Sequence, residues 1–316
     1  MWIKTALIFA LYFFSYAMII SNAYSGLALL GWYFLLGFSM GLVGFNFCHD
    51  VIHGAFFASP KLNRIFSYVF DFNGESSYIW RVSHNLLHHT YTNIPGHDED
   101  INKMIIMRFS PTDDHYAFHR YQHLYALPLY AFTSFNWALF SDYRWFVGEM
   151  KKGTIPKREV ALFFLFKALN LFAFLFLPMM VLSAPIWQVM LGFLFMHFGG
   201  GLTIALIFQL AHLVEGVEFP IPNEAGKIQK CWAEHELRTT SDFATDSPLL
   251  THLIGALNFQ VEHHLFTHVC HVHYPAIRPI LVQTAQEFGI PYHEHKTFTG
   301  AIVSHFKTLK RLGNPP

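Results

Sequence analysis

Charged residues are scarce in this chain. Lys, Arg, Asp and Glu make up 13% of its 316 residues, about half of the fraction that is usual in a soluble domain. None of the four occurs between residues 5 and 49. The formal net charge is zero with histidine neutral, so no basic field favours nucleic acid as a partner. The composition therefore argues against a soluble protein and against one that binds nucleic acid.

Cysteine is scarce as well. Cys48, Cys231 and Cys270 show no paired spacing, which disfavours a disulfide framework and predicts reduced thiols. A structural zinc site would call for thiolates among its ligands, and the chain offers few. What the chain has in excess is hydrophobic side chains, at 53% of residues, and histidine, which occurs 21 times.

Four apolar stretches are long enough to cross a bilayer, which takes about 20 residues. They cover residues 4–21, 27–47, 160–182 and 187–211. The first is longer than the apolar part of a secretory signal peptide and a second follows almost at once, which favours a retained span. Small residues predict close helix packing in the second and fourth stretches; they are Gly37, Gly41, Gly44 and Gly199–Gly201.

Basic residues predict the side on which the connections lie. Lys151, Lys152, Lys157 and Arg158 precede the third stretch, whereas the short connections after the first and third stretches carry no charge. By the positive-inside rule, the active site and both termini face the cytoplasm. We expect an all-α integral membrane protein with a single domain over residues 1–316. Its four transmembrane helices carry a cytosolic helical cap made of residues 48–158 and 212–316.

Three features near the spans carry further expectations. The fifth apolar stretch, 124–140, is interrupted by Pro128, and we expect it to lie in the membrane interface because a crossing there would separate the histidines described next. Lys167 is expected to extend its amine to the cytoplasmic face. His197 lies deep in the fourth stretch, where a structural hydrogen bond is the expected role.

Histidines gather just beyond the ends of the second and fourth stretches. They occur in HDVIH (49–53), HNLLHH (84–89), AHLVE (211–215) and QVEHHLF (260–266). Residues four apart on a helix share a face and can converge on one metal, whereas adjacent residues are turned about 100° apart. The two adjacent pairs, His88–His89 and His263–His264, therefore imply two metals close together. The candidate ligands are His49, His53, His84, His88, His89, His212, His263 and His264.

Other histidines and acids near these motifs receive different interpretations. His115, His119 and His123 repeat the same spacing among Tyr, Phe and Arg, and we expect surface or supporting roles for them. The acidic run Asp98–Asp100 either orients ligand imidazoles or forms a solvated turn. Imidazole suits zinc, copper, iron and nickel, and eight nitrogens shared by two metals leave open positions of the kind that oxygen chemistry on iron requires.

These motifs resemble the three histidine boxes of the membrane fatty acid desaturases. Those boxes read H-x-x-x-H, H-x-x-H-H or H-x-x-x-H-H, and H/Q-x-x-H-H, and the resemblance extends from about Gly44 to Phe306, including the number and order of the spans. It implies two iron ions held by the eight histidines, with O₂ as co-substrate. Gln260, at a ligand position of relatives with His there, either binds iron weakly or orients a water molecule. Trp80 matches an aromatic that borders the acyl tunnel, with an interfacial anchor as the alternative.

The resemblance also implies an activity and partners. The third box begins with glutamine and in this resembles the box of the front-end desaturases. Those enzymes insert a double bond between an existing one and the carboxyl end. The implied substrate is an acyl-CoA or an acyl lipid. The chain lacks the His-Pro-Gly-Gly motif of a fused cytochrome b5 domain, so electrons are expected from a separate ferredoxin, or from cytochrome b5 with its reductase. Alternatives are a hydroxylase or ketolase on the same scaffold, and a histidine-rich metal transporter, whose spans should carry more polar ligands.

Overall fold

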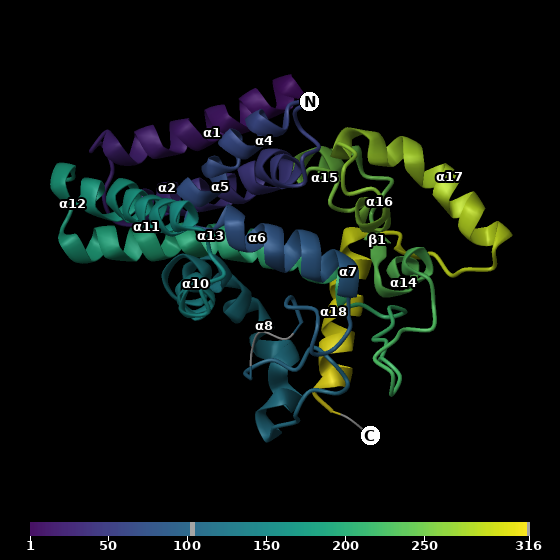
Figure 1. Ribbon diagram of the computed structural model, residues 1–316. Helices are drawn as coiled ribbons and strands as arrows, with labels where there is room; N and C mark the ends of the chain where they lie inside the picture. Colours follow the sequence, from purple (N-terminus) through teal and green to yellow (C-terminus); the bar gives the residue numbers. More distant parts are fainter. Residues whose placement is uncertain (102–104, 315–316) are drawn as a thin grey trace. The chain divides into compact units, whose positions relative to one another are not determined.

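The computed structural model describes residues 1–101 and 105–314 and is mostly helical (Figure 1). The chain forms two compact units. Unit 1 comprises Met1–Ile79 and Pro128–Ala205, and unit 2 comprises Trp80–Leu127 and Leu206–Pro316. Each unit has hydrophobic clusters of its own, such as Ile79 with Phe146 and Phe163 in unit 1. The expectation of a single domain stays a prediction.

Four helical segments have the length and hydropathy to cross a membrane, which confirms the predicted number and order of spans. The first is α1 (Trp2–Ile20). The second is α2 (Gly26–Val43), which continues through the π-helical turn η1 (Gly44–Cys48) into α3 (His49–Ile52). The third joins α11 (Lys157–Leu171), η5 (Phe172–Phe176) and α12 (Leu177–Val181), and the fourth is α13 (Ile186–His212).

Glycines bring α2 and α13 together within unit 1. A methyl group added at Gly37 would lie 1.7 Å from the carbonyl oxygen of Met196, and one at Gly199 would lie 2.3 Å from that of Phe34. One at Gly41 would lie 3.0 Å from the side chain of Thr203. The predicted packing face is thus confirmed for these glycines. It is wrong for Gly44, where an added methyl would meet no described atom within 4 Å.

Lys167 does not extend to the cytoplasmic face, so that prediction is wrong. The side chain is 4% exposed and its Nζ donates to the carbonyl oxygen of Gly74 at 2.6 Å and to Oδ2 of Asp142 at 2.9 Å. An ion pair inside the unit satisfies the amine without solvent, and nothing local to the third span signals that partner. His197 has the structural hydrogen bond expected of it, with Nδ1 3.0 Å from the hydroxyl of Ser134.

The fifth apolar stretch is broken into short pieces, and none of its helices is among the four candidate spans. They are α8 (Gln122–Ala131), α9 (Thr133–Asn136) and the π-helical turn η4 (Trp137–Ser141), after which α10 (Asp142–Lys151) begins. Pro128 lies inside α8. None of these pieces is long enough to be a candidate span, and the predicted position in the membrane interface stays a prediction.

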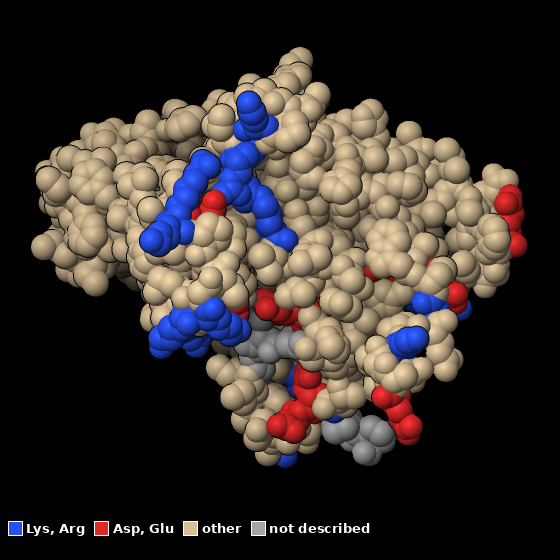
Figure 2. Space-filling model, in the orientation of Figure 1, with Lys and Arg blue, Asp and Glu red and all other residues tan. Residues whose placement is uncertain are grey.

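Unit 1 also carries the basic end of the third span. Lys61 and Arg64 lie in α4 (Pro60–Phe66), which precedes α5 (Tyr68–Phe72), and Lys157 and Arg158 begin α11. Figure 2 shows few charged residues on this face and a gathering of Lys and Arg over α4 and the start of α11. Arg64 binds Glu159 at 2.6 Å, which ties α4 to α11.

Unit 2 is built from short helices and one small sheet. In chain order its elements are α6 (Ser77–Val82, which begins in unit 1), η2 (Ser83–His88), α7 (His89–Tyr91), η3 (Ala117–Tyr121), α14 (Trp232–Thr239), β1 (Ser241–Phe243), α15 (Pro248–Leu253), α16 (Gln260–Leu265), η6 (His271–His273), α17 (Tyr274–Glu287), β2 (His293–His295) and α18 (Phe298–Leu312). β1 and β2 pair in parallel, with Ser241 opposite His293. Leu237, Val261 and Ala285 form a hydrophobic cluster that fixes α14 against α16 and α17.

Candidate metal centre

Six of the candidate histidines lie in unit 2, and all six are buried. The π-helical turn η2 carries His84 and His88, α7 begins with His89, α13 ends with His212, and α16 carries His263 and His264. Each is at most 6% exposed. Buried polar groups are costly unless they find partners, so the contacts of these imidazoles indicate what the site is built for.

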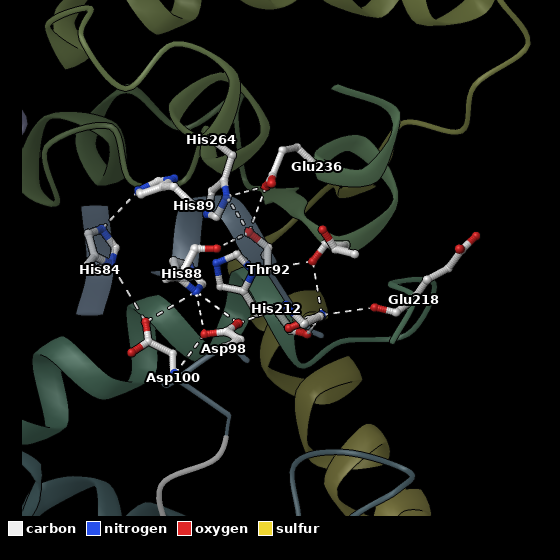
Figure 3. A network of polar contacts seen from close by, with 12 residues as sticks. His84, His88, His89, Thr92, Asp98, Asp100, His212, Glu218, Glu236 and His264 are labelled. Atoms are coloured by element: carbon white, nitrogen blue, oxygen red, sulfur yellow. Dashed lines mark hydrogen bonds and ion pairs between the residues drawn. The ribbon is translucent and has the colours of Figure 1, made fainter. Parts of the chain in front are cut away.

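Three of the six, His88, His212 and His264, form one group, which we call the His88 trio (Figure 3). One nitrogen of each ring lies within 4.8 Å of the corresponding nitrogens of the other two. Three imidazoles at this separation match the arrangement needed to ligate a single metal ion.

The Nδ1 atoms of the His88 trio are held by other groups. That of His88 lies 3.0 and 3.1 Å from the two carboxylate oxygens of Asp98, and that of His264 lies 2.8 Å from Oε2 of Glu236. Nδ1 of His212 lies 3.4 Å from the carbonyl oxygen of Thr239. An Nδ1–H that donates in this way leaves the Nε2 lone pair available to a metal.

The remaining nitrogens support the same assignment. Nε2 of His88 and Nε2 of His212 are buried and have no hydrogen-bond partner among the described residues. A buried imidazole nitrogen without a partner is destabilising unless it binds a ligand. The trio therefore fits a transition-metal ion with nitrogen ligands.

Of the other three histidines of unit 2, His84 and His263 belong to a second group of possible ligand atoms. His89 lies beside both groups. Its Nε2 is 3.3 Å from Nε2 of His84, and its ring centroid is 4.6 Å from that of His263 and 4.4 Å from that of His264. Nδ1 of His263 lies 3.3 Å from the hydroxyl of Tyr274. His263 and His264 thus belong to different groups, as predicted. That His88 and His89 serve different metals stays a prediction.

The local backbone of the second box differs from the α-helix that the spacing suggested. His84 and His88 lie in a π-helical turn, and their rings are nearly parallel, with centroids 5.1 Å apart and an interplanar angle of 17°. A π turn hydrogen-bonds from i to i+5 and is frequent at functional sites. The spacing of four residues keeps both imidazoles on one side, but the backbone type could not be read from the sequence.

The acidic turn supports the site through Asp98. This carboxylate is fully buried, and it also accepts the backbone N–H groups of Asn93 and Asp100, each at 2.9 Å. Burial alone would lower the pKa of His88, but the charges of Asp98 and Asp100 outweigh it and raise the pKa to about 9. Of the two alternatives for this turn, the contacts support orientation of an imidazole by Asp98. His97, the residue before it, is exposed.

Sequence reasoning missed three supporting residues. Glu236 is fully buried, binds His264 and accepts the hydroxyl of Thr92 at 2.9 Å. Burial raises the pKa of Glu236 to about 8, against the lowering effects of Thr92 and His88. Asn93, in a left-handed conformation with φ +57°, donates to the carbonyl oxygens of His212 and Thr239 at 3.0 and 3.2 Å. No local pattern distinguishes these residues from other polar ones.

Trp80 lies beside His84, and Gln260 is the first residue of the third box. The indole of Trp80 stacks on the ring of His84, with centroids 4.1 Å apart. Gln260 is 1% exposed and its Nε2 donates to the carbonyl oxygen of Leu257 at 2.9 Å. Its amide nitrogen therefore points to backbone. The roles of Trp80 toward substrate and of Gln260 toward iron stay predictions.

The first box lies in unit 1. His49 and His53 are 3% and 4% exposed, and their ring centroids are 4.6 Å apart, so they share one face as predicted. Their role as ligands stays a prediction. Among the histidines set apart from the site, His115 is exposed, whereas His119 is buried and binds the carbonyl oxygen of Ile105 through Nε2 at 2.8 Å. His119 therefore supports a loop.

Comparison with known proteins places these observations in a family. The profile of the fatty acid desaturase family matches residues 25–296. An sn-1 linoleoyl-lipid 6-desaturase of Arthrospira platensis is 37% identical over 89% of this chain and 77% of its own length. The protein of that name from Synechocystis sp. is 38% identical over 88% of this chain and 79% of its length. An acyl-lipid (8-3)-desaturase of Physcomitrium patens is 34% identical over 98% and 66%.

Proposed function

The chain belongs to the fatty acid desaturase family and is an oxidoreductase of that class, and from this premise we propose that it holds two iron ions and uses O₂ to desaturate the acyl chain of a lipid. The observation that carries the metal assignment is the His88 trio. Three buried imidazoles turn one nitrogen toward each other while Asp98, Glu236 and a backbone carbonyl hold the other.

The donor set favours iron with open positions. Imidazole is a ligand for iron, zinc, copper and nickel, whereas structural zinc sites are closed by four ligands that usually include thiolates. We propose that the trio holds one iron and that His84, His89 and His263 contribute to the other. His49 and His53 are assigned to the same centre on the family pattern and on their shared buried face.

Bound iron would supply, with O₂, the oxidant for breaking two unactivated C–H bonds. One O₂, two electrons and two protons are consumed with the two hydrogens of a –CH₂–CH₂– pair, giving a double bond and two waters. The side chains of this protein have other tasks. Asp98 and Glu236 fix the imidazoles, and burial of the site excludes bulk water from the reaction.

We infer a front-end specificity on an acyl lipid. The third box begins with Gln260, and the relatives reported above include two linoleoyl-lipid 6-desaturases and an acyl-lipid (8-3)-desaturase. A front-end enzyme places the new double bond by its distance from the carboxyl carbon. The substrate should therefore already be unsaturated.

We propose that the site and both termini face the cytoplasm and that a separate electron-transfer protein, a ferredoxin or cytochrome b5, supplies the electrons. Support for the orientation comes from Lys151, Lys152, Lys157 and Arg158 before the third span, together with the basic residues of α4. Figure 2 shows where Lys and Arg gather over α4 and α11.

The test is to express the full chain in a host fed linoleate or its homologue two carbons longer at the methyl end, and to locate new double bonds by mass spectrometry. We expect the bond to keep its distance from the carboxyl carbon in both products. His264→Ala should abolish the product, while His115→Ala, an exposed histidine outside the site, should retain most of it.

Different outcomes would reject different parts of the proposal. A bond that keeps its distance from the methyl end, or efficient conversion of stearate alone, would exclude the front-end assignment and leave the desaturase class intact. Purified protein that binds one zinc and no iron would exclude the di-iron assignment. A His264→Ala variant that retains full activity would show that the His88 trio is not a metal site.

A further inference from the structure

A groove of about 590 Å³ lies in unit 2 between the η3–α8 segment and α18, and none of the candidate metal ligands lines it, although His123 does. One wall carries Arg120, Tyr121 and Leu124, and the other carries Lys307, Lys310 and Arg311. Four of these six side chains are cationic. Among the described residues that line the groove, none is acidic.

The two walls are fixed to each other by buried contacts. Gln122 is fully buried, and its Nε2 donates to the carbonyl oxygen of Leu309 in α18 at 2.7 Å. Arg108 donates to the carbonyl oxygen of Leu312 at the end of the same helix. A methyl group added at Gly313 would lie 2.1 Å from the carbonyl oxygen of His119, so the backbones touch there. The groove is therefore preformed.

The cations of the groove are only weakly neutralised by the protein. Lys307 lies 3.8 Å from Glu215, and both side chains are more than half exposed, so solvent screens this pair. The guanidinium of Arg120 lies over the ring of Tyr121, 4.6 Å from its centroid. For Arg120, Lys310 and Arg311, the described residues provide no carboxylate within ion-pair distance. An anion is thus the complementary ligand.

Exposed apolar side chains lie directly beside these cations. The first turns of α8 are packed on one side by Gln122 and Ala126, both fully buried. The opposite side presents Leu124 and Leu127, which are 69% and 41% exposed, next to Tyr121 at 49%. Exposed leucines beside lysine and arginine are typical of a helix that lies in the headgroup region of a membrane.

We propose that this groove binds the phosphate of an anionic phospholipid headgroup, with Arg120, Lys310 and Arg311 contacting the phosphate while Leu124 and Leu127 enter the acyl boundary. The site is separate from the proposed metal centre and does not depend on desaturation.

The combination of features favours a lipid over the other anions that the cations would attract. A free phosphate would use the cations and leave the leucines exposed to water, which is unfavourable. An acidic protein would cover both the cations and the leucines. The chain, however, carries four helices suited to a bilayer, so it is constantly exposed to phospholipid.

The test uses the full-length protein in a neutral detergent, titrated with dihexanoyl phosphatidylglycerol, with the zwitterionic dihexanoyl phosphatidylcholine and with inorganic phosphate. Binding is measured by thermophoresis at low and moderate salt. The variant is Lys310→Gln/Arg311→Gln, and the matched control is Lys227→Gln/Lys296→Gln, which removes two exposed cations of the same unit. Loss of two cations near an anionic headgroup corresponds to roughly thirty-fold weaker binding.

We expect the phosphatidylglycerol titration to be weakened roughly thirty-fold in the Lys310/Arg311 variant and unchanged in the control, with salt weakening the wild-type interaction. Equal binding of both lipids, or phosphatidylglycerol binding that survives in the variant, would overturn the proposal. Inorganic phosphate competing at the same concentration would make this a free-phosphate site instead. If the variant instead lost binding of an acidic ferredoxin while keeping the lipid, the groove would be a protein-docking surface. Because the readout is lipid binding, failure here leaves the desaturase function untouched.

Discussion

Replacing Asp98 by asparagine tests whether this buried carboxylate supports metal binding by His88. Each oxygen of Asp98 contacts Nδ1 of His88, and each also accepts a backbone N–H, from Asn93 on one side and Asp100 on the other. Asparagine has nearly the same shape but only one accepting oxygen. Either orientation of its amide therefore points an NH₂ group at a backbone N–H.

The expected magnitude follows from these contacts. Loss of a carboxylate that orients a ligating histidine costs about 10- to 100-fold in metal affinity, or about 1.4–2.7 kcal/mol. Asp98 is fully buried and satisfies two backbone donors besides His88, so the effect should lie at the upper end, near 100-fold. The negative charge that favours a cation at His88 is lost as well.

The assay is iron retention by purified full-length protein against a graded series of chelator concentrations, with elemental analysis of the protein fraction. Asp114→Asn provides the control, because Asp114 is exposed and lies in the same unit. Circular dichroism and gel filtration establish that both variants are folded. The reasoning is refuted if folded Asp98→Asn protein keeps its iron at the same chelator concentration as the Asp114→Asn protein.

Two further predictions concern stability, both measured by thermal unfolding in detergent. Gly37→Ala should destabilise the protein by about 3 kcal/mol or more, because the added methyl would lie 1.7 Å from the carbonyl oxygen of Met196. Gly31→Ala should be neutral, because its methyl would meet nothing within 4 Å. Equal unfolding midpoints for the two variants would contradict the close packing. His305 is fully buried and its pKa is lowered from 6.5 to about 4 by burial, against its hydrogen bond to Leu213, so its stabilisation is complete above pH 6.5 and about 3 kcal/mol is lost as pH falls to 4. His305→Gln should remove this part of the loss of stability at low pH. A variant whose stability falls with pH as steeply as that of the wild type would contradict the prediction.

The parts of this molecule that the sequence predicted are those fixed by local periodicity. Four apolar runs of the right length predicted the four spans. The 100° turn between neighbouring residues predicted that His263 and His264 would belong to different groups, as they do, whereas the same prediction for His88 and His89 stays a prediction. Both arguments need only the geometry of one helix.

The parts that escaped prediction depend on contacts between distant segments. Lys167 is held by Asp142 and by backbone far from it in the chain, so its own span gives no sign of burial. Glu236 lies 144 residues from Thr92, to which it is hydrogen-bonded. A polar residue in a short helix predicts exposure by default, and only the tertiary fold shows that Glu236 is 0% exposed.

The charges of the site explain why these distant carboxylates matter. Asp98 and Glu236 are both fully buried, and each lies beside Nδ1 of a histidine. Without a metal ion, burial raises the pKa of Glu236 to about 8, while the neighbouring acids raise that of His88 to about 9. Protons then hold the charge balance at neutral pH. A divalent cation on the Nε2 side of His88 and His264 would replace those protons and favour the ionised form of Glu236, so metal binding would release protons from this site. Buried acids are costly without a compensating cation, so the same two carboxylates would favour a metal ion between the imidazoles.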